Sequence, residues 1–235
     1  ATQKLKTLSS IGEAKGELGE LRIDVQLDAE KKTLTISDRG IGMTGEEVDK
    51  YLNQVALSGA EEFVSKYKEQ NENNIIGKFG LGFYSAFMVS NKVEVNTLSY
   101  KEDAKAVKWE CDGSPSYTLE EISKDMRGTD IVLHINEEST EFLEPHRISS
   151  ILNKFCKFLP VPIFFEEKQI NNTSPAWVKK PTELTTQDYQ DFYKELYPFN
   201  EPPLFWIHLN VDYPFSLTGI LYFPKIKQSY EIQKD

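Results

Sequence analysis

The segment 77-GKFGLGFYSAFMVS-90 places three glycines within six residues, directly before an apolar, aromatic-rich stretch typical of a helix. The first N–H groups of a helix lack intrahelical partners, and the helix dipole adds partial positive charge there. Glycines let a phosphate approach such a helix start without steric hindrance. The pattern is neither a dinucleotide fingerprint nor a P-loop, since Phe79 follows Lys78 where the P-loop has Ser or Thr. It indicates an anion site, and a glycine turn needed only for helix packing is the alternative.

A second glycine-rich segment, 38-DRGIG-42, follows a predicted strand. A carboxylate at a strand end, next to glycines that admit a flat ligand, can accept a hydrogen bond from an adenine amino group. The alternative for Asp38 alone is a turn residue that caps the strand. Taken together, the two segments favour a nucleotide site over two unrelated turns.

The elements that would position these segments follow from the spacing of apolar residues. Strict alternation predicts strands at 21–28 and 33–38, joined as a hairpin. From Thr44, where Glu47 three residues later resembles a capping box, the pattern is helical to about Tyr67 and includes a second helix over AEEFVSKYK. Four more strands are expected as an antiparallel meander, at 93–100, 106–111, 116–122 and 129–136.

The rest of the chain predicts a further helix, a short strand and a second domain. An amphipathic helix over 146–159, ended by Pro160, has an apolar face made of Ile148, Ile151, Leu152, Phe155, Phe158 and Leu159. VPIFFEE then reads as a short strand. The composition changes at about residue 168, and a helix at 185–196 and strands at 204–211 and 217–224 follow. We therefore expect one domain over 1–167 and the beginning of a second α/β domain over 168–235.

Composition limits the possible partners. The formal net charge is −10 and no Lys/Arg cluster is present, which argues against nucleic acid. The 2 cysteines favour a reducing compartment, and no apolar run approaches the ~20 residues of a membrane span. We expect a cytoplasmic protein without a membrane partner. The opening ATQKLKTLSS is typical of the tail of a helix without its start signal, so we expect upstream residues to be missing.

Together with 127-RGT-129 at the head of a strand, these segments resemble the ATP-binding motifs shared by gyrase, MutL, sensor histidine kinases and heat-shock protein 90 chaperones. The longer segments SDRGIGMT, IGKFGLGFYSAFMVSNKVEV and RGTDIVLHI resemble the heat-shock protein 90 family specifically. PAWVKKPTELTTQDYQDFYKELYP and GILYFP resemble the beginning of that family's middle domain, and the short connection is similar to the bacterial form. The resemblance implies an α+β fold: a two-layer sandwich of a mostly antiparallel mixed sheet covered by helices.

The resemblance also implies which residues bind ATP or ADP. Asp38 would accept the adenine amino group, Gly42 and Thr129 would help through backbone, side chain and water, and Met43 would line the pocket. Residues 44–76 would form a lid, with EQNENN as its flexible part. The residues implied at the phosphates are Lys78, Phe79, Gly80, Leu81, Gly82 and Phe83.

The family's helix with the catalytic Glu and the Mg²⁺-binding Asn precedes ATQKLK in the pattern. We therefore expect no catalytic or metal-binding residue in this chain, and Mg²⁺ only with the intact upstream segment. A family lysine that reaches the phosphates corresponds to Leu57 here. The resemblance implies that the parent protein is an ATPase and chaperone. In it, ATP closes the lid and a homodimer, joined through a C-terminal domain outside this chain, to remodel unfolded or partly folded client proteins.

Two alternatives stay open. One is another ATPase of the same fold, although a histidine kinase should have a phosphoacceptor hairpin upstream, and a topoisomerase should continue into a basic domain where LTTQDYQDFYKEL is acidic. The other is a catalytically inactive module that binds a nucleotide or a partner through aromatic side chains. The candidates for that surface are Tyr189, Phe192, Tyr193, Phe199, Phe205 and Trp206.

Overall fold

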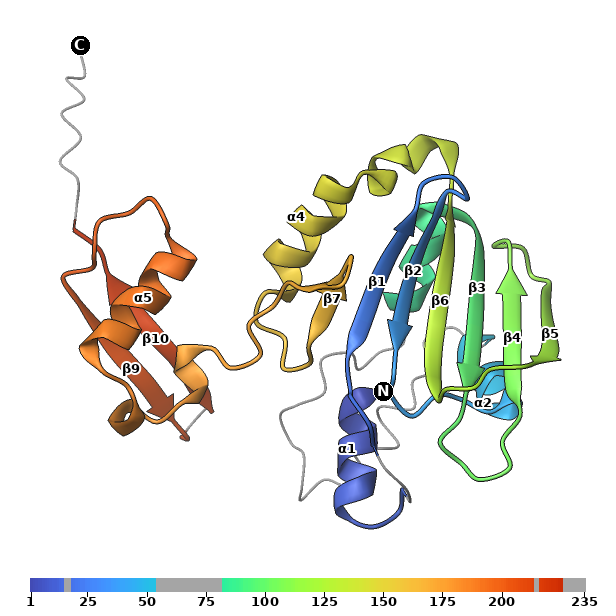
Figure 1. Ribbon diagram of the computed structural model, residues 1–235, viewed down its shortest axis with the longest axis horizontal. Coiled ribbons are helices and arrows are strands. Elements are labelled where there is room, and N and C mark those ends of the chain that lie inside the picture. The colour runs from blue at the N-terminus through green and yellow to red at the C-terminus, as the bar shows by residue number, and fades with distance from the viewer. Residues whose placement is uncertain (15–17, 54–81, 214–215, 226–235) are drawn as a thin grey trace. The chain divides into compact units, whose positions relative to one another are not determined.

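The computed structural model describes residues 1–14, 18–53, 82–213 and 216–225. The chain divides into two compact units, Ala1–Asn171 and Asn172–Asp235, which are described separately (Figure 1). This division falls near the boundary expected between residues 167 and 168. The assignment of the two parts to an ATP-binding domain and a middle domain stays a prediction.

The first unit is built on an eight-stranded sheet in the order β5-β4-β3-β6-β2-β1-β7-β8. All neighbouring strands are antiparallel except β1 and β7, which are parallel. A mostly antiparallel mixed sheet with helices confirms the expected α+β class. The strands are β1 (Ile23–Asp28), β2 (Thr33–Asp38), β3 (Ser90–Leu98), β4 (Ala106–Cys111), β5 (Tyr117–Ile122), β6 (Gly128–Ile135), β7 (Ile163–Phe165) and β8 (Lys168–Gln169).

The expected four-strand meander is wrong in its last strand. The strands β3, β4 and β5 follow one another as a meander, but β6 pairs with β3 and β2 rather than with β5 (Figure 1). β5 is exposed along nearly its whole length, whereas β6 has buried residues near both of its ends and no exposed residue. A strand with a buried face gains more from two neighbours than an exposed edge strand does. The alternation of apolar residues along the chain does not specify which strands will pair with β6.

Helices pack on one face of the sheet. They are α2 (Gly45–Leu52), the 3₁₀ helices η1 (Gly82–Met88) and η2 (Glu137–Leu143), and α4 (Pro145–Cys156). The helix α1 (Thr2–Ser10) precedes β1 and contributes none of the described residues in the core between these helices and the sheet. Val48 of α2 and Ile148 of α4 join Val25, Val93 and Leu133 of the strands in one buried core. The capping box at Thr44 is confirmed, because the Thr44 hydroxyl accepts the Glu47 N–H and the Glu47 carboxylate accepts the Thr44 N–H.

The helix expected over 146–159 is shorter and less uniformly buried than its apolar pattern predicts. It begins at Pro145, a residue whose fixed φ suits the first helical position, and it ends at Cys156, before Pro160. Phe155 is 68% exposed, although the periodicity placed it on the buried face. The core therefore needs only part of this apolar stripe.

The second unit has the helix α5 (Thr186–Leu196) and a two-stranded antiparallel sheet, β9 (Phe205–Val211) and β10 (Leu217–Phe223). Short 3₁₀ helices η3 (Ala176–Val178) and η4 (Pro181–Glu183) precede α5. Tyr189 stacks on Trp206 at 5.1 Å between ring centroids and bonds His208 Nδ1 through its hydroxyl at 2.8 Å. Phe192 and Tyr193 are buried as well.

Half of the proposed aromatic surface is therefore core. Of its six candidates, Tyr189, Phe192 and Tyr193 are buried, whereas Phe199 is 95% exposed and Phe205 is 50% exposed. The exposed apolar side chains of β9 and β10 lie at alternating positions, namely Phe205, Ile207, Val211, Leu217, Leu221 and Phe223. One face of the hairpin is thus apolar and open to solvent in this chain.

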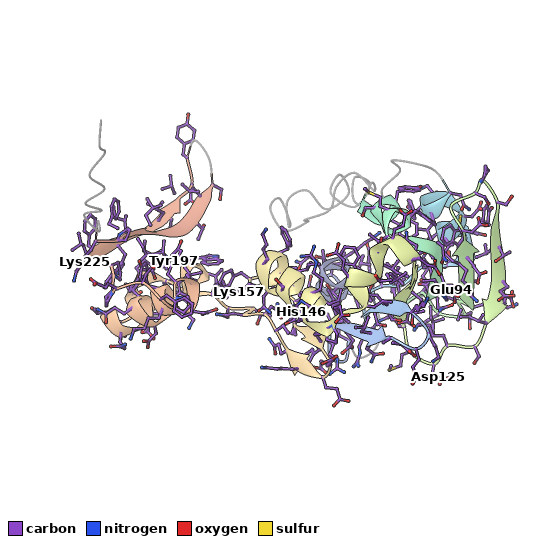
Figure 2. The ribbon with its side chains drawn as sticks, turned by 90° about the horizontal axis from the view of Figure 1, so that it is seen from above. Glu94, Asp125, His146, Lys157, Tyr197 and Lys225 are labelled. Atoms are coloured by element: carbon purple, nitrogen blue, oxygen red, sulfur yellow. The ribbon has the colours of Figure 1, made fainter. Side chains whose placement is uncertain are left out.

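The sheet face opposite the helices carries an ion-pair network across β4, β3 and β6. Glu94 of β3, labelled in Figure 2, accepts Lys92 Nζ at 2.8 Å and Lys108 Nζ at 3.2 Å, and lies 2.7 Å from His134 Nε2. Burial acts to raise the pKa of Glu94, but the hydrogen bonds from these three partners prevail and lower it to about 2. The ionised form of Glu94 is therefore the one that the fold favours.

We expect Glu94→Gln to lower the free energy of unfolding at pH 7 by about 1–2 kcal/mol, because the folded chain loses a carboxylate whose pKa lies below its ordinary value. A depressed pKa gives stability above the unfolded value of 4.5 and loses it as the pH falls through about 2. The difference between variant and wild type should therefore vanish near pH 2. Urea unfolding at several pH values measures it.

The control is Glu121→Gln on β5. Glu121 pairs with Lys105 at 2.8 Å, but the two side chains are 64% and 71% exposed. Exposed pairs contribute little, so this change should stay within about 0.5 kcal/mol. A Glu94→Gln effect no larger than that of Glu121→Gln would contradict the assignment.

Candidate nucleotide-binding site

Three polar side chains form a row across the sheet at one end of its core-facing side. Asp38 of β2 lies opposite Thr129 of β6, and Thr129 lies opposite Thr97 of β3. Alternation puts these residues on the same face as the core residues Leu34 and Leu133. Elsewhere this face is apolar, so a polar row here needs partners of its own.

Asp38 ends β2 and turns its carboxylate toward the loop that follows. Its Oδ1 accepts the Gly40 N–H at 2.7 Å. Burial raises the pKa of the Asp38 carboxyl, and the bond from Gly40 only partly opposes this. The carboxylate is thus partly desolvated, and a ligand that donates a hydrogen bond to it would stabilise its charged form.

Two glycines next to the row make backbone contacts that leave no space for a side chain. A Cβ on Gly42, whose φ is +60°, would lie 1.8 Å from the Leu98 carbonyl oxygen. A Cβ on Gly128, whose φ is +124°, would lie 2.1 Å from the Asp38 carbonyl oxygen. Both positions therefore require glycine for space and for backbone conformation. Their contacts hold the ends of β2, β3 and β6 together around the row.

Arg127 ties the Asp38 loop to other parts of the first unit. Its Nε donates to the Gly40 carbonyl oxygen at 3.1 Å, and another guanidinium nitrogen donates to the Leu18 carbonyl oxygen. Ala1 packs against the same loop, because a Cβ on Gly40 would lie 2.5 Å from the Ala1 Cβ. Figure 1 accordingly places the N-terminal end beside the end of β2.

Thr97 is the one member of the row that the sequence analysis missed. It is fully buried, and its hydroxyl accepts the Met43 N–H at 2.9 Å and lies 3.0 Å from Thr129 Oγ1. The available signal was the alternation Val93, Val95, Thr97, which puts a polar residue at a core-facing position. Such a position costs free energy unless the hydroxyl is hydrogen-bonded.

The structure brings Asp38, Gly42, Met43 and Thr129 together, as the sequence-based site requires. Lys78, Phe79, Gly80 and Leu81 lie outside the described residues, as do Leu57 and the lid beyond residue 53. Their roles stay predictions.

Gly82 and Phe83 begin η1, where the sequence suggested a helix and the structure has a 3₁₀ helix. Phe83 packs edge-to-face on Trp109 at 5.7 Å between ring centroids, so its ring belongs to the core. Gly82 is exposed, with no described atom within 4 Å of where a Cβ would lie. Backbone N–H groups, rather than the Phe83 ring, are what this segment could offer to an anion.

A cavity of about 440 Å³ is lined by Asp38 together with residues of the opposite face of the sheet. Its lining includes Asp24, Ser37 and Asp130, which alternate with the core-facing residues of their strands. Asp38 is the member of the polar row that also lines this cavity.

Within the described residues, no three His, Cys, Asp or Glu side chains are grouped to hold a metal ion. No helix in that part of the chain is long and apolar enough to span a membrane.

Comparison with known proteins identifies the class. Residues 15–132 match the family model of histidine kinase-, DNA gyrase B- and HSP90-like ATPases, and residues 161–235 match the model of Hsp90 protein. The chain therefore belongs to the family of histidine kinase-, DNA gyrase B- and HSP90-like ATPases, which supports nucleotide binding by this fold. Within it, the chain is a member of the Hsp90 chaperone family of the bacterial HtpG type, which confirms the resemblance found in its motifs.

The sequence relatives support the same family assignment. The chaperone proteins HtpG of Porphyromonas gingivalis and Bacteroides fragilis are each 60% identical to the chain over 250 aligned residues, which cover 100% of this chain and 36% of theirs. The HtpG of Desulfitobacterium hafniense is 36% identical over 96% of this chain and 37% of its own. The chain thus spans little more than a third of the length of these relatives.

We expect Asp38→Asn to raise the melting temperature at pH 7. A raised pKa means that the folded chain holds the ionised carboxylate at a cost relative to the unfolded chain, and the uncharged amide can still accept the Gly40 N–H. The gain should disappear as the pH falls below the ordinary value of 3.8, where Asp38 is protonated in both states. Thermal unfolding followed by circular dichroism measures it.

Asp28→Asn, at the end of β1, is the matched control with the opposite sign. Hydrogen bonds from the Lys31 backbone and side chain lower the pKa of Asp28. This variant should not gain stability at pH 7. A lower melting temperature for Asp38→Asn than for wild type would show that Asp38 is a structural turn residue.

Proposed function

We propose that the first unit binds ATP or ADP, and that the adenine amino group donates a hydrogen bond to the Asp38 carboxylate. The observation that carries the proposal is a desolvated carboxylate, with raised pKa, at a glycine-lined end of the sheet. A carboxylate is an acceptor only, so it suits an amino group and repels a carbonyl oxygen at the same place.

The neighbouring residues fit the rest of a purine. Thr129 lies directly opposite Asp38 and carries a hydroxyl, which donates or accepts. Met43, partly buried against the core, offers an apolar and adaptable surface. Asp38, Gly42, Met43 and Thr129 would therefore hold the base and set its orientation.

The phosphates would lie at residues 78–83, where the glycine pattern predicts free backbone N–H groups. When bound, ATP would supply free energy for closing the lid at 44–76. Mg²⁺ would accompany it in the parent protein, held by residues upstream of this chain.

For the whole protein we propose an ATP-dependent chaperone that acts in the cytoplasm as a homodimer on unfolded or partly folded client proteins. The match to the Hsp90 model over 161–235 and the names of the relatives favour this over a histidine kinase or a topoisomerase. A partner-binding module without nucleotide is the second candidate, favoured by the exposed apolar face of β9 and β10.

Nucleotide titration separates these candidates. By isothermal titration calorimetry, we expect the chain to bind ADP, and Asp38→Asn to weaken binding by about 10- to 100-fold, because a hydrogen bond to a charged group contributes about 1.5–3 kcal/mol. Inosine diphosphate has a carbonyl where adenine has its amino group. It should bind wild type at least about 10-fold more weakly than ADP.

The side-chain amide introduced by Asp38→Asn can turn to donate, so this variant should bring the two affinities closer together. Asp28→Asn, remote from the row on β1, should bind both nucleotides as wild type does. If wild type binds neither nucleotide, or if Asp38→Asn leaves the preference for ADP unchanged, the proposed base site is wrong.

A further inference from the structure

Thr97 connects three separate segments around the candidate base site. Its hydroxyl accepts the Met43 N–H at 2.9 Å, lies 3.2 Å from the Gly128 carbonyl oxygen, and lies 3.0 Å from Thr129 Oγ1. Met43 follows the Asp38 loop, whereas Gly128 and Thr129 begin β6. One buried oxygen atom thus joins the loop after β2 to the start of β6.

The three neighbours of this hydroxyl allow two hydrogen-bond arrangements. A threonine hydroxyl has one proton and two lone pairs. The Met43 N–H occupies one lone pair, and the proton goes to Gly128 O or to Thr129 Oγ1. In the first arrangement Thr129 donates back to Thr97, whereas in the second Thr129 accepts from Thr97 and keeps its own proton for another partner.

The choice between these arrangements decides what Thr129 offers to a ligand. In the first, Thr129 can only accept, and in the second it can donate. No heavy atom has to move between them, since both use the same oxygen positions. The Asp38 carboxylate beside it can only accept, so Thr129 is the member of the row whose polarity can adapt to a base.

We propose that Thr97 is a positioning residue of the nucleotide site, which fixes the Met43 backbone and sets the hydrogen-bonding polarity of the Thr129 hydroxyl toward the purine. The inference rests on the proposed nucleotide-binding function and extends it to a residue without access to solvent. Thr97 is 0% exposed, so it acts through its neighbours and not by touching the ligand.

A simple packing role is the alternative, and an exchange to valine separates the two. Valine keeps the shape of threonine but leaves the Met43 N–H without its acceptor and Thr129 without its partner. We expect Thr97→Val to weaken ADP binding by about tenfold, since one well-made hydrogen bond has about that effect. Thr97→Ser keeps the hydroxyl and should bind within about twofold of wild type.

Thr33→Val is the matched control. Thr33 is also a buried threonine, but it lies at the other end of β2, roughly 17 Å along the strand from Asp38. It should bind ADP as wild type does, whatever its effect on the melting temperature. Thr97→Cys, with a weakly bonding thiol, provides a second variant if Thr97→Val does not fold, and should also lose affinity.

A double-mutant cycle tests whether Thr97 acts through Thr129. If it does, Thr97→Val should weaken ADP binding by no more than about threefold once Thr129 is already valine, because the interaction is absent in that background. Full additivity of Thr97→Val and Thr129→Val would overturn the proposed route. Equal ADP affinity in Thr97→Val, Thr97→Cys and Thr33→Val would overturn the role of Thr97 altogether.

Asp38→Asn in the same series keeps the two proposals apart. Loss of binding in Asp38→Asn with full binding in Thr97→Val contradicts only the inference about Thr97. Absence of ADP binding by the wild-type chain overturns both.

Discussion

The site depends on close contact between the ends of β2, β3 and β6 at two glycines. The backbone at Gly42 reaches the Leu98 carbonyl, and the backbone at Gly128 reaches that of Asp38, each nearer than any Cβ permits. These contacts fix the register that sets Asp38 opposite Thr129. A slip of one residue would turn one of these side chains to the other face of the sheet, so the register itself creates the polar row.

The row also replaces apolar residues on the core-facing side of the sheet by polar ones, which costs stability. Along β3 the core-facing residues change from Val93 and Val95 to Thr97, and Asp38 stands where an apolar residue would pack without cost. Thr97 and Thr129 hydrogen-bond to each other, whereas burial raises the pKa of the Asp38 carboxyl and so disfavours its charged form. The free-energy cost of desolvation thus falls on the carboxylate that is proposed to contact the ligand.

Local signals in the sequence predicted the parts of this architecture that depend on local physics. The capping box at Thr44, the hairpin of β1 and β2, and the position of Asp38 at a strand end all follow from short-range spacing. The partner of β6 and the exposure of Phe155 did not follow, because both depend on which surfaces meet in three dimensions. Thr97 escaped notice for the same reason, since its three partners lie on other segments.

In the proposed site, different segments of the chain would bind the base and the phosphates. The base would contact side chains that the register of the sheet holds in place. The sequence assigns the phosphates to the glycine segment at 77–82 and closure to the lid at 44–76, and both assignments stay predictions. A fold shared across this ATPase family is compatible with different uses of a nucleotide, because function depends on the loops and domains attached to the fold.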